Sequence, residues 1–244
     1  LMAWELKPGD AVFCPSFTFV ATAQVVPWLG ATPVFVDIDA STYNMDPASL
    51  RAEIASVKAA GKLNPKVVIA VDLFGQPANY PEIKAICDEF GLKLIADTAQ
   101  GFGCTLNGKY PSDWADIATT SFFPAKPLGC YGDGGAMFTN DGVLADKLRS
   151  FAFHGKGETQ YDNVRVGINS RLDTLQAAIL IEKLAILEEE MVARQLVADR
   201  YDAGLGDILK ASRNLGRGRS AWAQYAVETP KRDGLKAHLG EKGI

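Results

Sequence analysis

An aspartate and a lysine, Asp97 and Lys126, stand at the ends of two largely apolar runs and lie 29 positions apart. Asp97 closes the run 92–96, and Lys126 follows the run 117–123 within the segment Ser-Phe-Phe-Pro-Ala-Lys-Pro-Leu-Gly. Such runs predict buried strands, and α/β proteins bind ligands at the carboxyl ends of their strands. Pyridoxal 5'-phosphate (PLP) needs a lysine amine for its Schiff base and a carboxylate facing its protonated ring nitrogen. The two residues therefore predict a PLP site with Lys126 and Asp97 as its catalytic pair.

Each residue also has a simpler explanation. An aspartate after a strand can cap a loop or bind magnesium, and a single lysine usually lies at the surface. The glycines of residues 129–135 lack the order of a dinucleotide-binding loop and the Lys-Ser ending of a P-loop, so we interpret them as a tight turn into a strand. Because Asp97 and Lys126 each follow a predicted buried strand, a PLP site is favoured over these simpler explanations.

The elements that would position this pair are those of an α/β fold, a mostly parallel sheet sandwiched by helices. Apolar runs predict strands at residues 11–14, 33–36, 66–73, 93–96, 117–122 and 135–139, and amphipathic stretches predict helices at 18–29, 47–59, 80–90 and 141–151. From residue 170 onward, leucines at helical spacing predict a long helix that leaves the main domain. We expect a large cofactor-binding domain over residues 1–185, and a linking helix with the start of a small α+β domain over residues 186–244.

The start of that long helix offers a position where a phosphate group could bind. Ser170-x-x-Asp173 fits a capping box. Asn169 would then lie beside the positive end of the helix, a position that suits a phosphate group.

Composition excludes several classes of function. The chain has 244 residues with 48% hydrophobic content, and its net charge of −4 includes no basic block, so no nucleic-acid partner is predicted. Four cysteines without a Cys-x-x-Cys pair and two histidines indicate neither a metal site nor a disulfide framework, which favours a cytoplasmic protein. No stretch approaches the roughly 20 apolar residues of a membrane-spanning helix.

Four blocks of the sequence, taken in order, resemble the DegT/StrS family of PLP-dependent sugar-nucleotide aminotransferases, which have the aspartate aminotransferase fold (fold type I). The blocks are Pro-Ser-Phe-Thr-Phe-Val-Ala-Thr (15–22), Asp-Thr-Ala-Gln (97–100), residues 120–135 around Lys126, and Gly-Ile-Asn-Ser-Arg-Leu-Asp (167–173). The resemblance covers nearly the whole chain. The stretch around Lys126 is similar to that of the UDP-2-acetamido-2-deoxy-3-oxo-glucuronate aminotransferases.

The resemblance implies a role for each matching residue. Lys126 would form the Schiff base and carry the proton, and Asp97 would hold the proton of the ring nitrogen. The other implied contacts of the cofactor are Gln100 near its phenolic oxygen, Ser121 at its phosphate, Phe19 stacked on its ring, and Asn169 reaching a phosphate across the interface of a homodimer with shared active sites. Arg171 and His154 would line the channel for the sugar nucleotide.

The resemblance also implies a reaction. An amino acid, with glutamate as the expected donor, would give its amino group to a keto-sugar nucleotide for amino-sugar and surface-polysaccharide biosynthesis. One alternative is a sugar dehydratase of the same fold, although those relatives have histidine in place of the lysine. Another is a non-catalytic sugar-nucleotide-binding or regulatory protein on the same scaffold. Compared with the family, the chain is expected to be truncated at both ends, without the glycine-threonine turn that binds the PLP phosphate.

Overall fold

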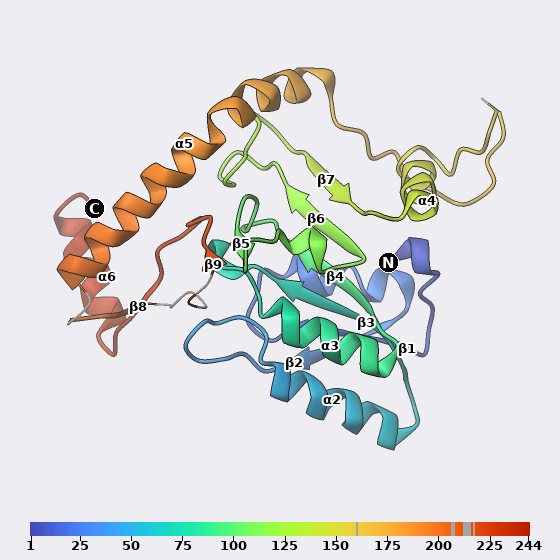
Figure 1. Ribbon diagram of the computed structural model, residues 1–244, viewed down its shortest axis with the longest axis horizontal. Helices are drawn as coiled ribbons and strands as arrows, with labels where there is room; N and C mark the ends of the chain where they lie inside the picture. Colours follow the sequence, from blue (N-terminus) through green and yellow to red (C-terminus); the bar gives the residue numbers. More distant parts are fainter. Residues whose placement is uncertain (160, 206–207, 212–215, 217) are drawn as a thin grey trace.

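The computed structural model describes residues 1–159, 161–205, 208–211, 216 and 218–244, and its centre is a six-stranded sheet (Figure 1). The strands lie in the order β2-β1-β3-β4-β6-β7, with the bounds β1 Asp10–Pro15, β2 Thr32–Val36, β3 Asn64–Val71, β4 Lys93–Asp97, β6 Ile117–Ser121 and β7 Gly135–Phe138. All neighbouring pairs are parallel except β6 and β7. The predicted α/β fold and its six strands are confirmed.

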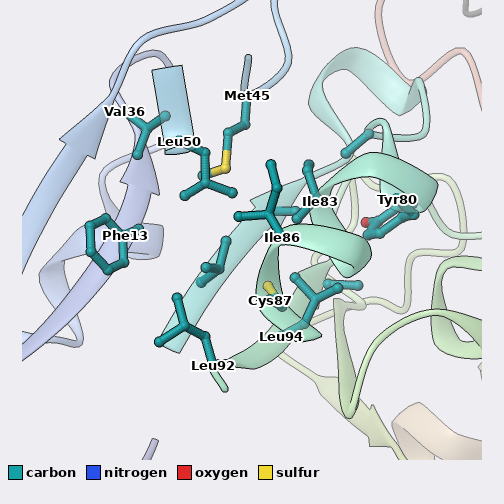
Figure 2. Close-up of a cluster of buried hydrophobic side chains, with 14 of the residues drawn as sticks. Phe13, Val36, Met45, Leu50, Tyr80, Ile83, Ile86, Cys87, Leu92 and Leu94 are labelled. Atoms are coloured by element: carbon teal, nitrogen blue, oxygen red, sulfur yellow. The ribbon is translucent and has the colours of Figure 1, made fainter. Parts of the chain in front are cut away.

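Helices cover both faces of the sheet. Side chains of successive strand residues point to opposite faces, so Phe13 and Leu94 belong to one core cluster while Val12 and Ile95 belong to the other. The first cluster packs the sheet against α2 (Pro47–Ala60) and α3 (Tyr80–Phe90), as Figure 2 shows. The second cluster is covered by residues of η1 (Met2–Trp4), α1 (Ala21–Gln24) and η2 (Pro27–Leu29).

The helix predicted over residues 18–29 is replaced by the two short pieces α1 and η2. Pro27 separates them because its ring nitrogen has no hydrogen to donate to a preceding turn. The predicted helices at 47–59, 80–90 and 141–151 occur as α2, α3 and α4 (Gly142–Ala152). Asp46 caps α2 by accepting the amide hydrogens of Ala48 and Ser49.

The long helix α5 (Thr174–Leu205) runs from the β6–β7 side of the sheet toward the C-terminus (Figure 1). Its first backbone bond joins the Ala177 amide to the Asp173 carbonyl, so the capping box predicted at Ser170 does not form. Position 185 lies inside this helix, and the division of the chain there stays a prediction. The remaining elements are η3 Leu73–Gly75, β5 Thr105–Leu106, η4 Pro111–Asp113, β8 Lys210–Ala211, β9 Gly218–Arg219, β10 Val227–Glu228 and α6 Arg232–Glu241. Among the helices that the structure describes, none has the length and apolar character needed to cross a membrane.

Candidate active site

Asp97 is the last residue of β4, at the carboxyl edge of the sheet. Its Oδ2 accepts a hydrogen bond of 2.9 Å from the Thr22 hydroxyl, and its Oδ1 accepts one of 3.2 Å from the Ala99 amide. Burial raises the pKa of Asp97, while these two donors and the charge of Lys126 act in the opposite direction. The carboxylate is therefore oriented by two short contacts and lies within electrostatic reach of the lysine.

Lys126 lies in the connection between β6 and β7, the one antiparallel pair of the sheet. The loop closes where the Cys130 amide donates to the Phe122 carbonyl at 2.8 Å, and the Lys126 amide donates to the Phe123 carbonyl at 2.9 Å. A side chain at Gly129 would place its Cβ 2.6 Å from the Pro124 carbonyl oxygen, so only glycine fits this turn. The local sequence thus folds tightly around the lysine, which is half-buried.

Helix α5 holds this loop from outside. Lys183 Nζ donates to the Gly129 carbonyl at 2.7 Å, and Gln176 Oε1 accepts from the Tyr131 amide at 2.8 Å. The sequence predicted the long helix, but it gave no signal that two of its polar side chains bind the loop of the lysine.

Three further predicted site residues lie at or just after the carboxyl ends of β1, β4 and β6. Gln100 Oε1 accepts a hydrogen bond of 2.6 Å from the Phe74 amide, and Ser121 Oγ, at the end of β6, accepts one of 3.2 Å from the Phe123 amide. Phe19 lies just after β1 and is 68% exposed. The structure thus gathers these residues at the carboxyl edge that holds Asp97 and Lys126, and their roles stay predictions.

His154, Asn169 and Arg171 form a separate group after α4. Arg171 Nε donates to Asn169 Oδ1 at 3.0 Å, and the His154 amide donates to the Ile168 carbonyl at 2.9 Å. Among the described residues, no hydrogen bond, ion pair or ring contact connects this group with Asp97 or Lys126. Figure 1 shows the segment extending beyond α4, on the opposite side of the sheet from β8 and β9. Asn169 also precedes the start of α5 by several residues, so it does not lie at the first turn of that helix.

Two polar residues of the site were not predicted. Thr22 belongs to a block that the resemblance identified, and its bond to Asp97 depends on a contact between segments 75 residues apart. Asp72 follows β3 as Asp97 ends β4, so the rule that found Asp97 would have found it too. Asp72 is fully buried, its amide donates to the Asp97 carbonyl at 3.0 Å, and burial raises its pKa to about 7.

The donor set at this edge fits PLP. A carboxylate stands at the end of one strand and a lysine in the loop after the next, with an exposed aromatic ring, an amide and a hydroxyl from adjacent loops. The carboxylate suits the protonated ring nitrogen, the amine suits the aldehyde, and the ring suits an aromatic cofactor face. These are the groups that PLP requires, and Lys126 Nζ is the amine whose charge reaches Asp97.

The fold is the one that the structural relatives share, fold type I of the PLP enzymes, and the side chains at this edge suit that cofactor. The sequence matches the DegT/DnrJ/EryC1/StrS aminotransferase family over residues 1–244, and the chain belongs to that family. The family is PLP-dependent.

Individual relatives agree with this membership. The UDP-2-acetamido-2-deoxy-3-oxo-D-glucuronate aminotransferase of Pseudomonas aeruginosa is 47% identical over 248 residues, which cover 100% of this chain and 66% of that protein. A pleiotropic regulatory protein of Geobacillus stearothermophilus is 41% identical, covering 100% of this chain and 64% of its own length. The crystal structure of a DegT DnrJ EryC1 StrS aminotransferase from Brucella abortus superposes with a TM-score of 0.98 at 57% identity, covering 100% of this chain and 65% of that one. The chain thus spans about two thirds of the length of these relatives.

Proposed function

We propose that this chain carries the cofactor site of a PLP-dependent aminotransferase that moves an amino group from an amino acid to a keto-sugar nucleotide. The observation that carries the proposal is the placement of Asp97 and Lys126 at one edge of the sheet, within electrostatic reach of each other. The name of the Pseudomonas aeruginosa relative supports UDP-2-acetamido-2-deoxy-3-oxo-D-glucuronate as the class of acceptor, and glutamate is the donor that we expect.

The side chains would divide the work as follows. Bound PLP supplies an electron sink next to the amine of the substrate. Asp97, oriented by Thr22, would keep the ring nitrogen protonated. The Lys126 amine would hold the cofactor through its aldehyde and, once the amine of the substrate has displaced it, would be free to move a proton at the reacting carbon. Phe19 provides an apolar surface for the ring, and Ser121 offers its hydroxyl to the phosphate. Each role uses the chemistry of a group that the fold already brings to this edge.

We further infer a homodimer in which Asn169, His154 and Arg171 serve the active site of the partner. The three residues belong to a segment without a bond to the Asp97 and Lys126 of their own chain among the described residues. That segment also exposes large apolar side chains, namely Tyr161 (89%), Val164 (55%), Val166 (87%) and Ile168 (53%). Apolar side chains gathered on one projecting segment favour contact with another protein surface.

We place the reaction in the cytoplasm. All four cysteines are free and buried, which suits a reducing compartment.

The alternatives predict different behaviour. A sugar dehydratase of this fold would lack the lysine, so Lys126 disfavours it. A regulatory protein, the function named for the Geobacillus stearothermophilus relative, could bind the cofactor or the sugar nucleotide without transferring an amino group.

Visible absorbance of the purified chain with PLP tests the proposal. Addition of PLP should give a protein-bound visible band that disappears on adding glutamate and returns on adding a keto-sugar nucleotide. Lys126→Ala should abolish the band, and Asp97→Asn should weaken PLP binding and nearly abolish amino transfer. Lys93→Ala, at the opposite end of β4, is the matched control and should behave as the wild type. A bound band without amino transfer would favour the regulatory protein, and activity retained in Lys126→Ala would reject the mechanism.

A further inference from the structure

The turn after β3 contains a phenylalanine in a conformation that its side chain disfavours. Phe74 has φ 61° and ψ 6°, in the left-handed region that glycine and asparagine adopt far more readily. Two buried side chains hold this turn. The Leu73 amide donates to Asn44 Oδ1 at 3.0 Å, and the Ala78 amide donates to Asp72 Oδ1 at 3.0 Å. Backbone strain of this kind persists only where the surroundings impose it, and it concentrates at functional sites.

The strained conformation aims the Phe74 amide at a residue of the candidate site. This amide donates a hydrogen bond of 2.6 Å to the side chain of Gln100. A backbone N–H can only donate, so the atom of Gln100 that it meets is the oxygen Oε1, since the opposite assignment would place two donors face to face. The Nε2 group of Gln100, which carries two donors and no acceptor, is consequently turned away from Phe74.

Residues 221–224, near the C-terminus, also bind this turn. The Ala221 amide donates to the Gly75 carbonyl at 2.8 Å, and the Gln224 amide donates to the Phe74 carbonyl at 3.3 Å. A Cβ on Gly75 would lie 2.7 Å from the Trp222 backbone nitrogen, which shows how closely the two backbones approach. The turn is therefore fixed on both sides, with the Phe74 amide directed at Gln100.

We propose that Phe74 is a positioning residue whose backbone amide fixes Gln100 as a hydrogen-bond donor toward the cofactor. The proposal rests on the proposed function and on the place near the phenolic oxygen of PLP that the resemblance implies for Gln100. A donor stabilises the anionic form of a phenol, whereas an amide oxygen in the same place would destabilise it. The turn thereby determines that the NH₂ group of Gln100, and not its oxygen, faces the cofactor.

Two substitutions of Phe74 separate the backbone effect from loss of the ring. Phe74→Asn and Phe74→Val both remove the ring and its edge-on contacts with Phe17 and Tyr43. Asparagine tolerates the left-handed conformation and the β-branched valine does not. In the cofactor-free protein, hydrogen exchange of the residue 74 amide should stay at the wild-type rate in Phe74→Asn and become at least tenfold faster in Phe74→Val.

Two substitutions of Gln100 test the same bond from its other end, and they serve if Phe74→Val does not fold. Gln100→Glu keeps an acceptor for the Phe74 amide but offers no donor to the cofactor, whereas Gln100→Leu removes both. The amide should remain protected in Gln100→Glu and exchange at least tenfold faster in Gln100→Leu. In the PLP-loaded protein, the pH midpoint of the visible band should rise in both Gln100 variants and in Phe74→Val, and should keep its wild-type value in Phe74→Asn.

The two readouts fail independently. Equal exchange rates in Gln100→Leu and the wild type would overturn the positioning role, whatever the cofactor does. Absence of a PLP band in the wild type would reject the proposed function and the cofactor half of the inference, while the exchange data would still decide whether Phe74 orients Gln100. Equal midpoints in Gln100→Glu and the wild type would show that Gln100 is not a donor to the ring.

Discussion

Replacing Asp72 with asparagine should remove a pH dependence of stability that burial imposes on the wild type. The Asp72 side chain is fully buried, and its Oδ1 accepts the Tyr80 hydroxyl at 2.7 Å and the Ala78 amide at 3.0 Å. The Cys104 thiol lies 3.6 Å from Oδ2, and no described cation forms an ion pair with this carboxylate. Burial, reinforced by the charge of Asp97, raises the pKa of Asp72 to about 7, whereas Tyr80, Ala78 and Cys104 oppose the rise without cancelling it.

The sign of the effect follows from the two pKa values. The folded state holds the Asp72 proton up to about pH 7, whereas the unfolded chain releases it near the ordinary value of 3.8. The contribution of this group to stability is therefore greatest at low pH and is lost as the pH rises from about 4 to 7. Between pH 5 and pH 8 the loss amounts to about 3 kcal/mol, at about 1.4 kcal/mol for each pH unit below 7.

The assay is denaturant unfolding of the cofactor-free protein at pH 5, 6, 7 and 8. Asparagine keeps the oxygen that accepts from Ala78 and Tyr80 but carries no charge at any of these values. The free energy of unfolding of Asp72→Asn, compared with that of the wild type, should therefore gain about 3 kcal/mol between pH 5 and pH 8. Asp37→Asn makes the same chemical change at an exposed position and should follow the wild type. Parallel curves for Asp72→Asn and the wild type would refute the argument from burial.

Two further predictions concern the cofactor site. Thr22→Val removes the hydroxyl that donates to Asp97, so the pKa of Asp97 should rise. The dissociation constant of PLP, measured by absorbance titration, should then increase about tenfold or more. An unchanged dissociation constant would contradict this role of Thr22. Gly129→Ala should abolish the PLP band because its Cβ would meet the Pro124 carbonyl oxygen at 2.6 Å, whereas Gly142→Ala, where the Cβ has open space, should keep the band at full strength.

The sequence contained enough information for the fold and the central pair. Six apolar runs predicted six strands, and the rule that ligands bind at carboxyl ends identified Asp97 as a site residue once Lys126 was considered with it. Asp97 and Lys126 come together because β4 and β6 are neighbours in the sheet, which short connections between consecutive strands favour. The helix predicted over 18–29, with a kink expected at Pro27, occurs as two short pieces on either side of that kink, because a proline interrupts the backbone bonds of a helix.

The contacts that orient the site could not be predicted, because they depend on strand order and on loop conformations far apart in sequence. Thr22 contacts Asp97 only because a single strand, β3, separates β1 from β4 in the sheet. Phe74 reaches Gln100 only because β3 and β4 are parallel neighbours whose following loops emerge side by side, one of them in a left-handed turn that nothing in the residue type suggests. A parallel sheet brings the starts of successive loops to one edge, so residues that follow different strands can bind one another there. The sequence therefore predicts which residue types lie at this edge. How their side chains are oriented depends on the conformations of the loops that the sheet brings together.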